Sequence, residues 1–188
     1  MRSTTSLGTV TSIGQKTMIR IWHPMRDPHH CCFRILALLV ASKKSLSVSR
    51  ASILDTFLLF PEYLHDVQYT GFGELRGALT RLNLPKSKDS FLNLPDIRTI
   101  YRELQVFQKA AFHQMVARNI LSSASFKVNE LQLSDKGIPN ELKRAIEAFV
   151  SENSERLEFI VGDLGAIPLD GPTGLFRRTN LEMGGRFR

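Results

Sequence analysis

The sequence has few cysteines and no long apolar run, and both absences restrict what the protein can be. Its two cysteines are the neighbours Cys31 and Cys32, and adjacent cysteines cannot form a disulfide of normal geometry without distorting the backbone. The longest uninterrupted apolar run, residues 35–41, is far shorter than the roughly 20 residues that cross a bilayer. Residues 1–15 contain no apolar block of the signal-peptide type. We therefore expect a soluble protein of the reducing cytoplasm that has no membrane partner.

The net charge of +7 is concentrated at the two ends of the chain. Residues 1–26 contain four basic residues and no acid, and residues 171–188 contain four arginines and one acid. The intervening residues 27–170 contain 17 basic and 17 acidic residues, so this part is neutral. The basic composition therefore does not by itself indicate a DNA-binding face on the folded part. It predicts instead that two basic ends reach phosphates or an acidic partner.

Length and composition predict one domain with a tail at each end. A chain of 188 residues, 43% of them hydrophobic, is long enough for one domain with a real core. Residues 1–16 are rich in serine, threonine and glycine, so we expect a flexible N-terminal tail there. The domain is expected to cover residues 17–162. Residues 163–188 are rich in glycine and arginine, and we expect a C-terminal tail without regular secondary structure.

Helix-capping residues and the spacing of apolar residues predict a mainly helical domain. Asp27 followed by Pro28 is a strong helix start, because the carboxylate accepts free amide protons and proline is tolerated in the first turn. The helix that follows is apolar on almost every side, so it should be the buried central helix. The expected helices cover residues 28–42, 50–60, 74–82, 96–121 and 142–162.

Two short β segments are predicted among these helices. Residues 46–48 can form a very short strand between the first two helices. Residues 125–133 change the parity of their apolar positions, which fits a bulged strand or a tight two-strand wing. A winged-helix domain begins with this order of elements, a buried helix followed by a short strand and another apolar helix. We therefore expect a mainly α fold with a small β wing (α+β), a winged-helix-like core, a C-terminal helix and flexible tails.

No motif of an enzyme is present. The sequence lacks the P-loop, the nucleophile elbow and the zinc-protease helix, and the glycines of residues 71–77 do not have the dinucleotide-binding spacing. His113, in the long helix, has no obvious nucleophile beside it, so a surface or interface histidine is the simpler interpretation. We expect no catalytic residue and no cofactor.

A group of histidines and cysteines near the first helix contains ligand types that zinc prefers. Neighbouring residues of a helix point about 100° apart, however, so they cannot all converge on one ion. We therefore expect buried thiols beside a histidine-rich helix start, and no metal site. The group consists of His23, Asp27, His29, His30, Cys31 and Cys32.

Two charged residues interrupt apolar runs. Arg34 lies between Phe33 and Ile35, and Asp55 lies within the second apolar helix. Each could lie on the one exposed strip of its helix. Alternatively the two pair across the helices, because a buried charge is costly unless it is paired. We predict a buried or half-buried Arg34–Asp55 ion pair.

Two kinds of interaction surface are predicted. Tyr101, Phe112 and Val116 lie off the main apolar stripe of the long helix, and such residues mark a protein interface when they are exposed. Basic residues outside apolar patterns are candidates for phosphate contact, with ordinary solvated charge as the alternative for each. They are Arg76, Arg81, Lys86, Lys88, Lys127, Lys136, Arg177, Arg178, Arg186 and Arg188.

Several segments resemble a middle component of the bacterial ABC three-component systems, to which the Lamassu antiphage systems are related. The resemblance covers roughly residues 20–135. It rests on HPMRDPHHCCFRIL at residues 23–36, which contains the Asp-Pro-x-His helix start and Arg34, and on ILDTFLLFP at residues 53–61. LPDI at residues 94–97 and LSDKG at residues 133–137 extend it.

The resemblance implies a small non-enzymatic subunit with a winged-helix-like core. Its partners would be an SMC or Rad50-like ABC ATPase that senses foreign DNA and an effector subunit, often a nuclease. Contact with double-stranded DNA would occur through the assembled complex. The alternative is a stand-alone winged-helix transcriptional regulator, which is normally a dimer with a basic recognition helix. The neutral charge of residues 27–170 favours the bridging subunit.

Overall fold

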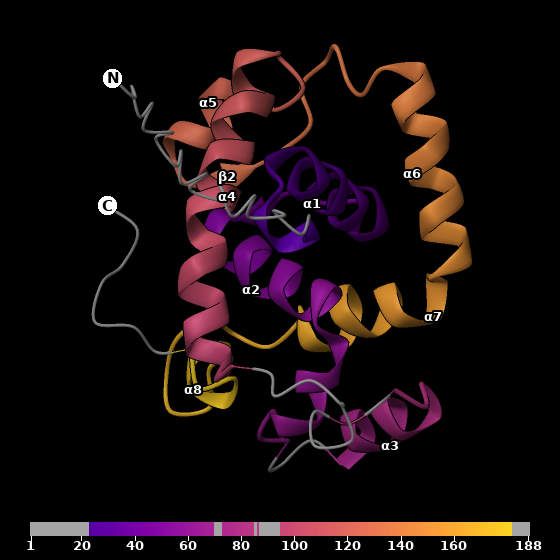
Figure 1. The fold of residues 1–188 in the computed structure, drawn as a ribbon, viewed down its shortest axis with the longest axis vertical. Coiled ribbons are helices and arrows are strands. Elements are labelled where there is room, and N and C mark those ends of the chain that lie inside the picture. Colours follow the sequence, from indigo (N-terminus) through magenta and orange to yellow (C-terminus); the bar gives the residue numbers. More distant parts are fainter. Residues whose placement is uncertain (1–22, 70–72, 85, 87–94, 182–188) are drawn as a thin grey trace, which may run out of the picture.

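The computed structural model describes residues 23–69, 73–84, 86 and 95–181. Helices dominate these residues, and one small antiparallel sheet accompanies them, which confirms the predicted mainly α fold class. Figure 1 shows α1 and α2 at the centre, with α4 on one side and α6 on the other. The described α-helices are α1 (Pro28–Ser42), α2 (Val48–Leu59), α3 (Gly73–Arg81), α4 (Ile97–Ala117), α5 (Ser123–Lys127), α6 (Asn140–Glu152), α7 (Ser154–Leu157) and α8 (Leu175–Arg178).

Shorter helical segments connect these helices. The 3-10 helices η1 (Pro24–Arg26) and η2 (Pro61–Asp66) precede α1 and follow α2, and the π-helix η4 (Glu158–Leu164) follows α7. The predicted helix over 142–162 is therefore divided, because α6 ends at Glu152 and a second helical segment begins after Asn153. No described helix has the length and apolar character needed to cross a membrane.

The central helix α1 begins where the sequence predicts. Asp27 accepts a hydrogen bond from the backbone N–H of His29 over 2.8 Å, and Pro28 occupies the first turn. The helix packs against α2, α4 and α6, so it is apolar on several sides. It ends at Lys43, which adopts the left-handed conformation (φ 54°, ψ 15°) while its N–H donates to Leu39 O.

The strands of the sheet are paired differently from those of the predicted wing. Strand β1 (Leu46–Ser47) pairs with β2 (Glu130–Leu131), with Leu46 opposite Leu131 and Ser47 opposite Glu130. Residues 123–127 form helix α5, because Ser122 caps its first turn through the N–H of Ser125. The expectation of a strand or hairpin over all of 125–133 is wrong. The winged-helix comparison stays a prediction.

The C-terminal segment up to Leu181 packs into the folded domain, so the expectation of a tail outside the domain is wrong for residues 163–181. Regular structure within it is confined to the end of η4 and to α8, and residues 165–174 form turns and irregular backbone. Leu164, Ile167, Leu175 and Leu181 are buried in the core, and α8 lies within this segment. Glycines lie between these four apolar residues in the sequence, so the residues form no periodic pattern that would predict a buried segment. The predicted tail of residues 1–16 lies outside the described residues.

Two arginines hold this segment against the helical core. Arg50 of α2 donates to the carbonyl oxygens of Gly165 and Ile167. Arg178 donates from Nε to Thr173 O and from Nη1 to Gln68 O, each over 2.6 Å. A guanidinium group carries several N–H donors, so the half-buried Arg50 and the buried Arg178 each satisfy two carbonyl groups at once. These arginines therefore stabilise irregular backbone that neither a helix nor a sheet satisfies.

Candidate functional site

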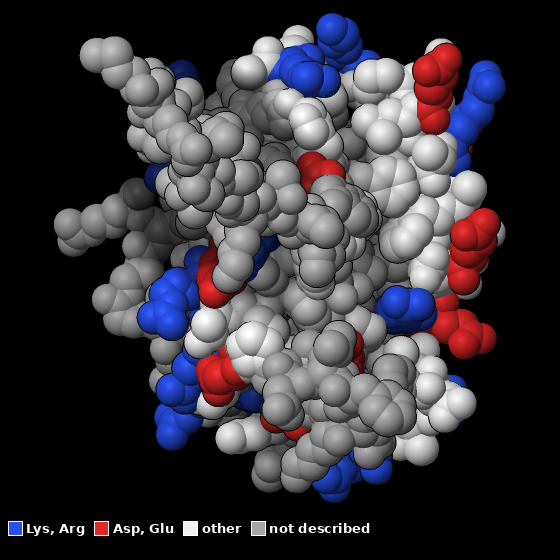
Figure 2. Space-filling model, viewed as in Figure 1, with Lys and Arg blue, Asp and Glu red and all other residues white. Residues whose placement is uncertain are grey.

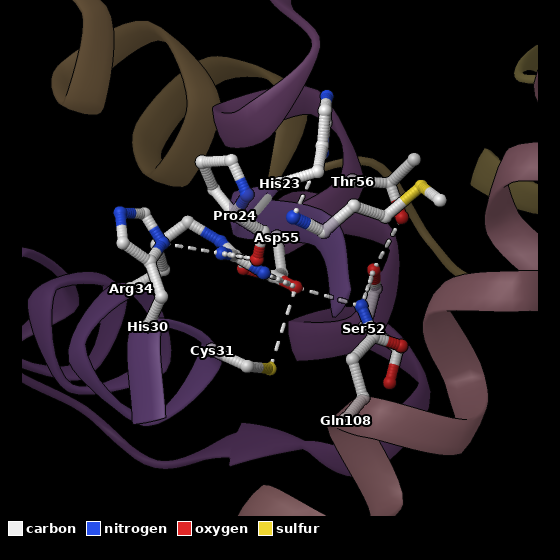
Figure 3. A network of polar contacts seen from close by, with 10 residues as sticks. His23, Pro24, His30, Cys31, Arg34, Ser52, Asp55, Thr56 and Gln108 are labelled. Atoms are coloured by element: carbon white, nitrogen blue, oxygen red, sulfur yellow. Dashed lines mark hydrogen bonds and ion pairs between the residues drawn. The ribbon is translucent and has the colours of Figure 1, made fainter. Parts of the chain in front are cut away.

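A polar cluster lies at the centre of the domain, between α1, α2 and α4 (Figure 3). It consists of Arg34 and Cys31 from α1, Asp55 from α2 and Gln108 from α4, and we call it the Asp55 cluster. Asp55 has an exposed fraction of 0% and Arg34 of 2%. The cluster therefore joins three helices through charges that have no access to solvent.

The structure brings together the two charges that the sequence analysis pairs. Arg34 donates from Nε to Asp55 Oδ1 over 2.6 Å and from Nη2 to Asp55 Oδ2 over 3.1 Å. Two parallel hydrogen bonds of this kind fix the relative orientation of both side chains. Burial by itself lowers the pKa of Arg34, but the charge of Asp55 and its hydrogen bonds leave that pKa above its ordinary value. Arg34 therefore keeps its charge, and its two hydrogen bonds to Asp55 fix the packing of α1 on α2.

Gln108 completes the cluster and was not predicted. Its Nε2 donates to Asp55 Oδ2 over 2.8 Å and to Ser52 O over 3.1 Å. Gln108 Oε1 and Ser52 Oγ are buried without a hydrogen-bond partner. A signal was present in the sequence, because Gln108 occupies the apolar stripe of α4 between Leu104 and Ala111. A polar residue at such a position indicates a buried polar partner.

His30 links the Asp55 cluster to the surface. Its Nδ1 lies 2.6 Å from Arg34 Nη1, and because arginine has no acceptor, Nδ1 must accept this hydrogen bond. A proton on Nδ1 would remove the bond and place two cations together. Burial, followed by the charge of Arg34, lowers the pKa of His30, and Asp27 and Asp55 oppose this change. His30 is therefore neutral in the folded state near neutral pH.

The stability of the domain should fall on acidification because of His30. Its folded pKa lies below the unfolded value of 6.5, so the unfolded state binds more protons as the pH drops below about 6.5. We expect the free energy of unfolding, measured with urea across this pH range, to decrease in the wild type. The decrease should be smaller in His30→Gln and unchanged in His29→Gln, which alters the neighbouring exposed histidine. An equal pH dependence in His30→Gln and the wild type would contradict this assignment.

The histidines and cysteines near α1 do not converge. The ring of His23 stacks on Phe60 with 6.1 Å between centroids, and Cys31 Sγ lies 3.8 Å from Asp55 Oδ2. Cys32 Sγ instead lies 3.7 Å from Ala111 O. Burial raises the pKa of both thiols, that of Cys32 to about 11. Within the described part of the chain, no three metal-binding side chains form a group that could hold an ion.

The predicted partner interface on α4 is wrong for two of its three residues. Tyr101 and Phe112 each have an exposed fraction of 1%, and Val116 is half-buried. The stripe is wider than predicted because α4 is covered by α1, α2 and η1, and the Phe112 ring lies 6.5 Å from that of Phe126 in α5. Burial raises the pKa of Tyr101 to about 12. Tyr101 and Phe112 hold the domain together and offer no surface to a partner, whereas contact of Val116 with a partner stays a prediction.

The candidate phosphate contacts do not form one site. Arg178 is buried and donates to backbone carbonyls, so its assignment as a nucleic-acid contact is wrong. The α3 helix with Arg76 and Arg81 lies at the opposite end of the molecule from α5 with Lys127 (Figure 1). In Figure 2 the visible basic side chains are spread around the edge of the face, interspersed with acidic ones. The exposed candidates are Arg76, Arg81, Lys86, Lys127, Lys136 and Arg177, whereas Lys88, Arg186 and Arg188 lie outside the described residues.

Comparison with known proteins identifies the family of the chain. The comparisons with curated proteins and with solved structures gave no match. Residues 20–184 match the family described as ABC-three component (ABC-3C) system Middle Component 5. The match extends beyond the segments that carry the resemblance and includes α6, the π-helix and α8. The chain belongs to the Middle Component 5 family of the ABC three-component systems.

Proposed function

We propose that this protein is the bridging subunit of a bacterial antiphage defence complex related to the Lamassu systems. It couples an SMC or Rad50-like ABC ATPase that senses foreign DNA to an effector, for which a nuclease is the expected class. The observation that carries this proposal is the family match over residues 20–184, because a middle component is by its description one part of a three-component system.

The architecture supports the role of a rigid connector. The Asp55 cluster joins α1, α2 and α4 through buried hydrogen bonds, and the C-terminal segment is fixed to the same core by Arg50 and Arg178. Buried interactions that connect distant segments favour one well-defined arrangement of the chain. A connector of this kind transmits a change of position between two partners without an active site of its own.

The surface of α4 does not favour the alternative, a stand-alone DNA-binding regulator. A recognition helix presents polar and basic side chains to base edges. The exposed residues of α4 include Arg102, Lys109 and His113, but Glu103 and the apolar Val106, Ala110 and Ala117 interrupt them. Arg98 donates a hydrogen bond from Nε to the carbonyl oxygen of Asn180 over 2.9 Å, so it is occupied within the domain. We propose instead that the assembled complex contacts DNA, and that exposed basic residues of this protein add contacts to phosphates.

Co-purification and DNA binding test this function together. We expect the protein to purify with the ABC ATPase and the effector encoded beside it. In a fluorescence-anisotropy titration with duplex DNA, the protein alone should bind weakly, and a mixture with the ATPase should bind more tightly than either component. The affinity of the mixture should fall with salt, because phosphate contacts release counterions. Tight, sequence-specific binding by the protein alone would favour the regulator and contradict the bridging role.

A further inference from the structure

A hollow of about 370 Å³ lies beside the small sheet, lined by residues at the C-terminal end of α1 and by the two residues that follow β2. The buried Leu39 and the half-buried Val40 and Leu133 give the hollow an aliphatic surface. Lys43, Lys44, Ser45 and Gln132 complete its lining, and all four are exposed. The hollow thus combines an apolar floor with a basic rim.

The charge of this rim has no partner within the described residues. No carboxylate lines the hollow, and the described ion pairs involve neither Lys43 nor Lys44. The lining also contains no aromatic ring on which a nucleic-acid base could stack. An apolar floor and unpaired ammonium groups instead match an aliphatic or aromatic side chain that has carboxylates beside it.

The backbone conformation of Lys43 is a second, independent observation. The described non-glycine residues with positive φ are Lys43 and four asparagines, Asn83, Asn119, Asn129 and Asn180. Asparagine tolerates the left-handed conformation, and glycine adopts it without steric cost, whereas lysine does not. The fold would therefore be more stable with glycine at position 43. The positive charge of Lys43 at the C-terminal end of α1 recovers part of this cost through the helix dipole, and contact with an acidic partner would use the same charge.

We propose that this hollow is the docking point for a segment of one of the other two components of the system. The segment presents one bulky apolar side chain to Leu39, Val40 and Leu133, and its flanking aspartate or glutamate residues contact Lys43 and Lys44. This inference rests on the proposed bridging function and identifies a surface through which the protein would bind one of its partners. It places the contact at the C-terminal end of α1, away from the Asp55 cluster and from α3.

Substitution of the two lysines separates docking from folding. In Lys43→Gly we expect an unchanged or higher melting temperature, together with at least tenfold weaker binding to the purified ATPase or effector. Lys44→Glu should weaken the same binding by a similar factor. Asn83→Gly is the matched backbone control, since it changes another left-handed residue, and Lys109→Glu is the matched charge control, since it reverses an exposed lysine on α4. Both controls should bind like the wild type.

A photo-crosslinking residue at Gln132 identifies the occupant, with Ala145 of α6 as the control position. The expected product joins position 132 to a component segment in which an apolar residue has aspartate or glutamate within a few positions. A crosslink to a second copy of this chain, or weakened binding of duplex DNA but not of protein in Lys43→Gly, would overturn the proposal. If the wild type binds neither component, both the proposed bridging function and the proposed docking point are wrong. If the wild type binds and both lysine variants bind equally well, only the docking point is wrong.

Discussion

Replacing Asp55 by alanine is expected to lower the free energy of unfolding by about 3–5 kcal/mol, because it leaves the charge of Arg34 buried and unpaired. Asp55 accepts two hydrogen bonds from Arg34 and one from Gln108, and its side chain is fully buried. Urea denaturation followed by circular dichroism measures the loss.

A double substitution distinguishes the loss of the pair from the cost of one unpaired charge. In Arg34→Met combined with Asp55→Leu, no buried charge remains in the Asp55 cluster, so we expect much of the lost stability to return. Arg26 and Glu103 provide the matched surface control, since their side chains lie 3.9 Å apart and are 68% and 47% exposed. Glu103→Gln should change the stability by no more than about 1 kcal/mol. Equal losses in Asp55→Ala and Glu103→Gln would show that the Asp55 cluster does not hold the helices together.

Leu175→Ala should reduce the free energy of unfolding by about 2–5 kcal/mol, the range for leucine-to-alanine changes that leave a cavity in a core. Leu175 has an exposed fraction of 0%, although it lies in the glycine- and arginine-rich segment near the end of the described chain. The loss should appear in the same urea transition as that of Asp55→Ala, because this segment packs on the common core.

Arg177→Ala is the control for this position. Arg177 is the exposed residue of the same short helix, and exposed substitutions away from special features change stability by about 0.5 kcal/mol or less. Indistinguishable stabilities of Leu175→Ala, Arg177→Ala and the wild type would mean that residues 163–181 add little to the fold.

Local signals in the sequence determine the beginnings of the helices. Asp27 and Pro28 predict the start of α1, and Asp96 predicts that of α4, because capping depends on a side chain and the amide groups one or two residues away. The Arg34–Asp55 pair was also predictable, since an isolated charge within an apolar helix needs a partner in the facing helix. These predictions succeed because the interactions lie within one turn of a helix or follow directly from the cost of burying a charge.

Other features depend on which elements cover a given face, and only the tertiary structure decides them. Tyr101 and Phe112 lie off the main stripe of α4, but more than one element packs around this helix and buries them. Strand β2 pairs with β1, more than 80 residues earlier in the chain, so residues 123–127 are free to form a helix. Gln108, Arg50 and Arg178 also find partners more than 50 positions away in the chain. The sequence determines local capping and the need for partners, whereas long-range packing determines which partners are available, because burial depends on surfaces that no local pattern contains.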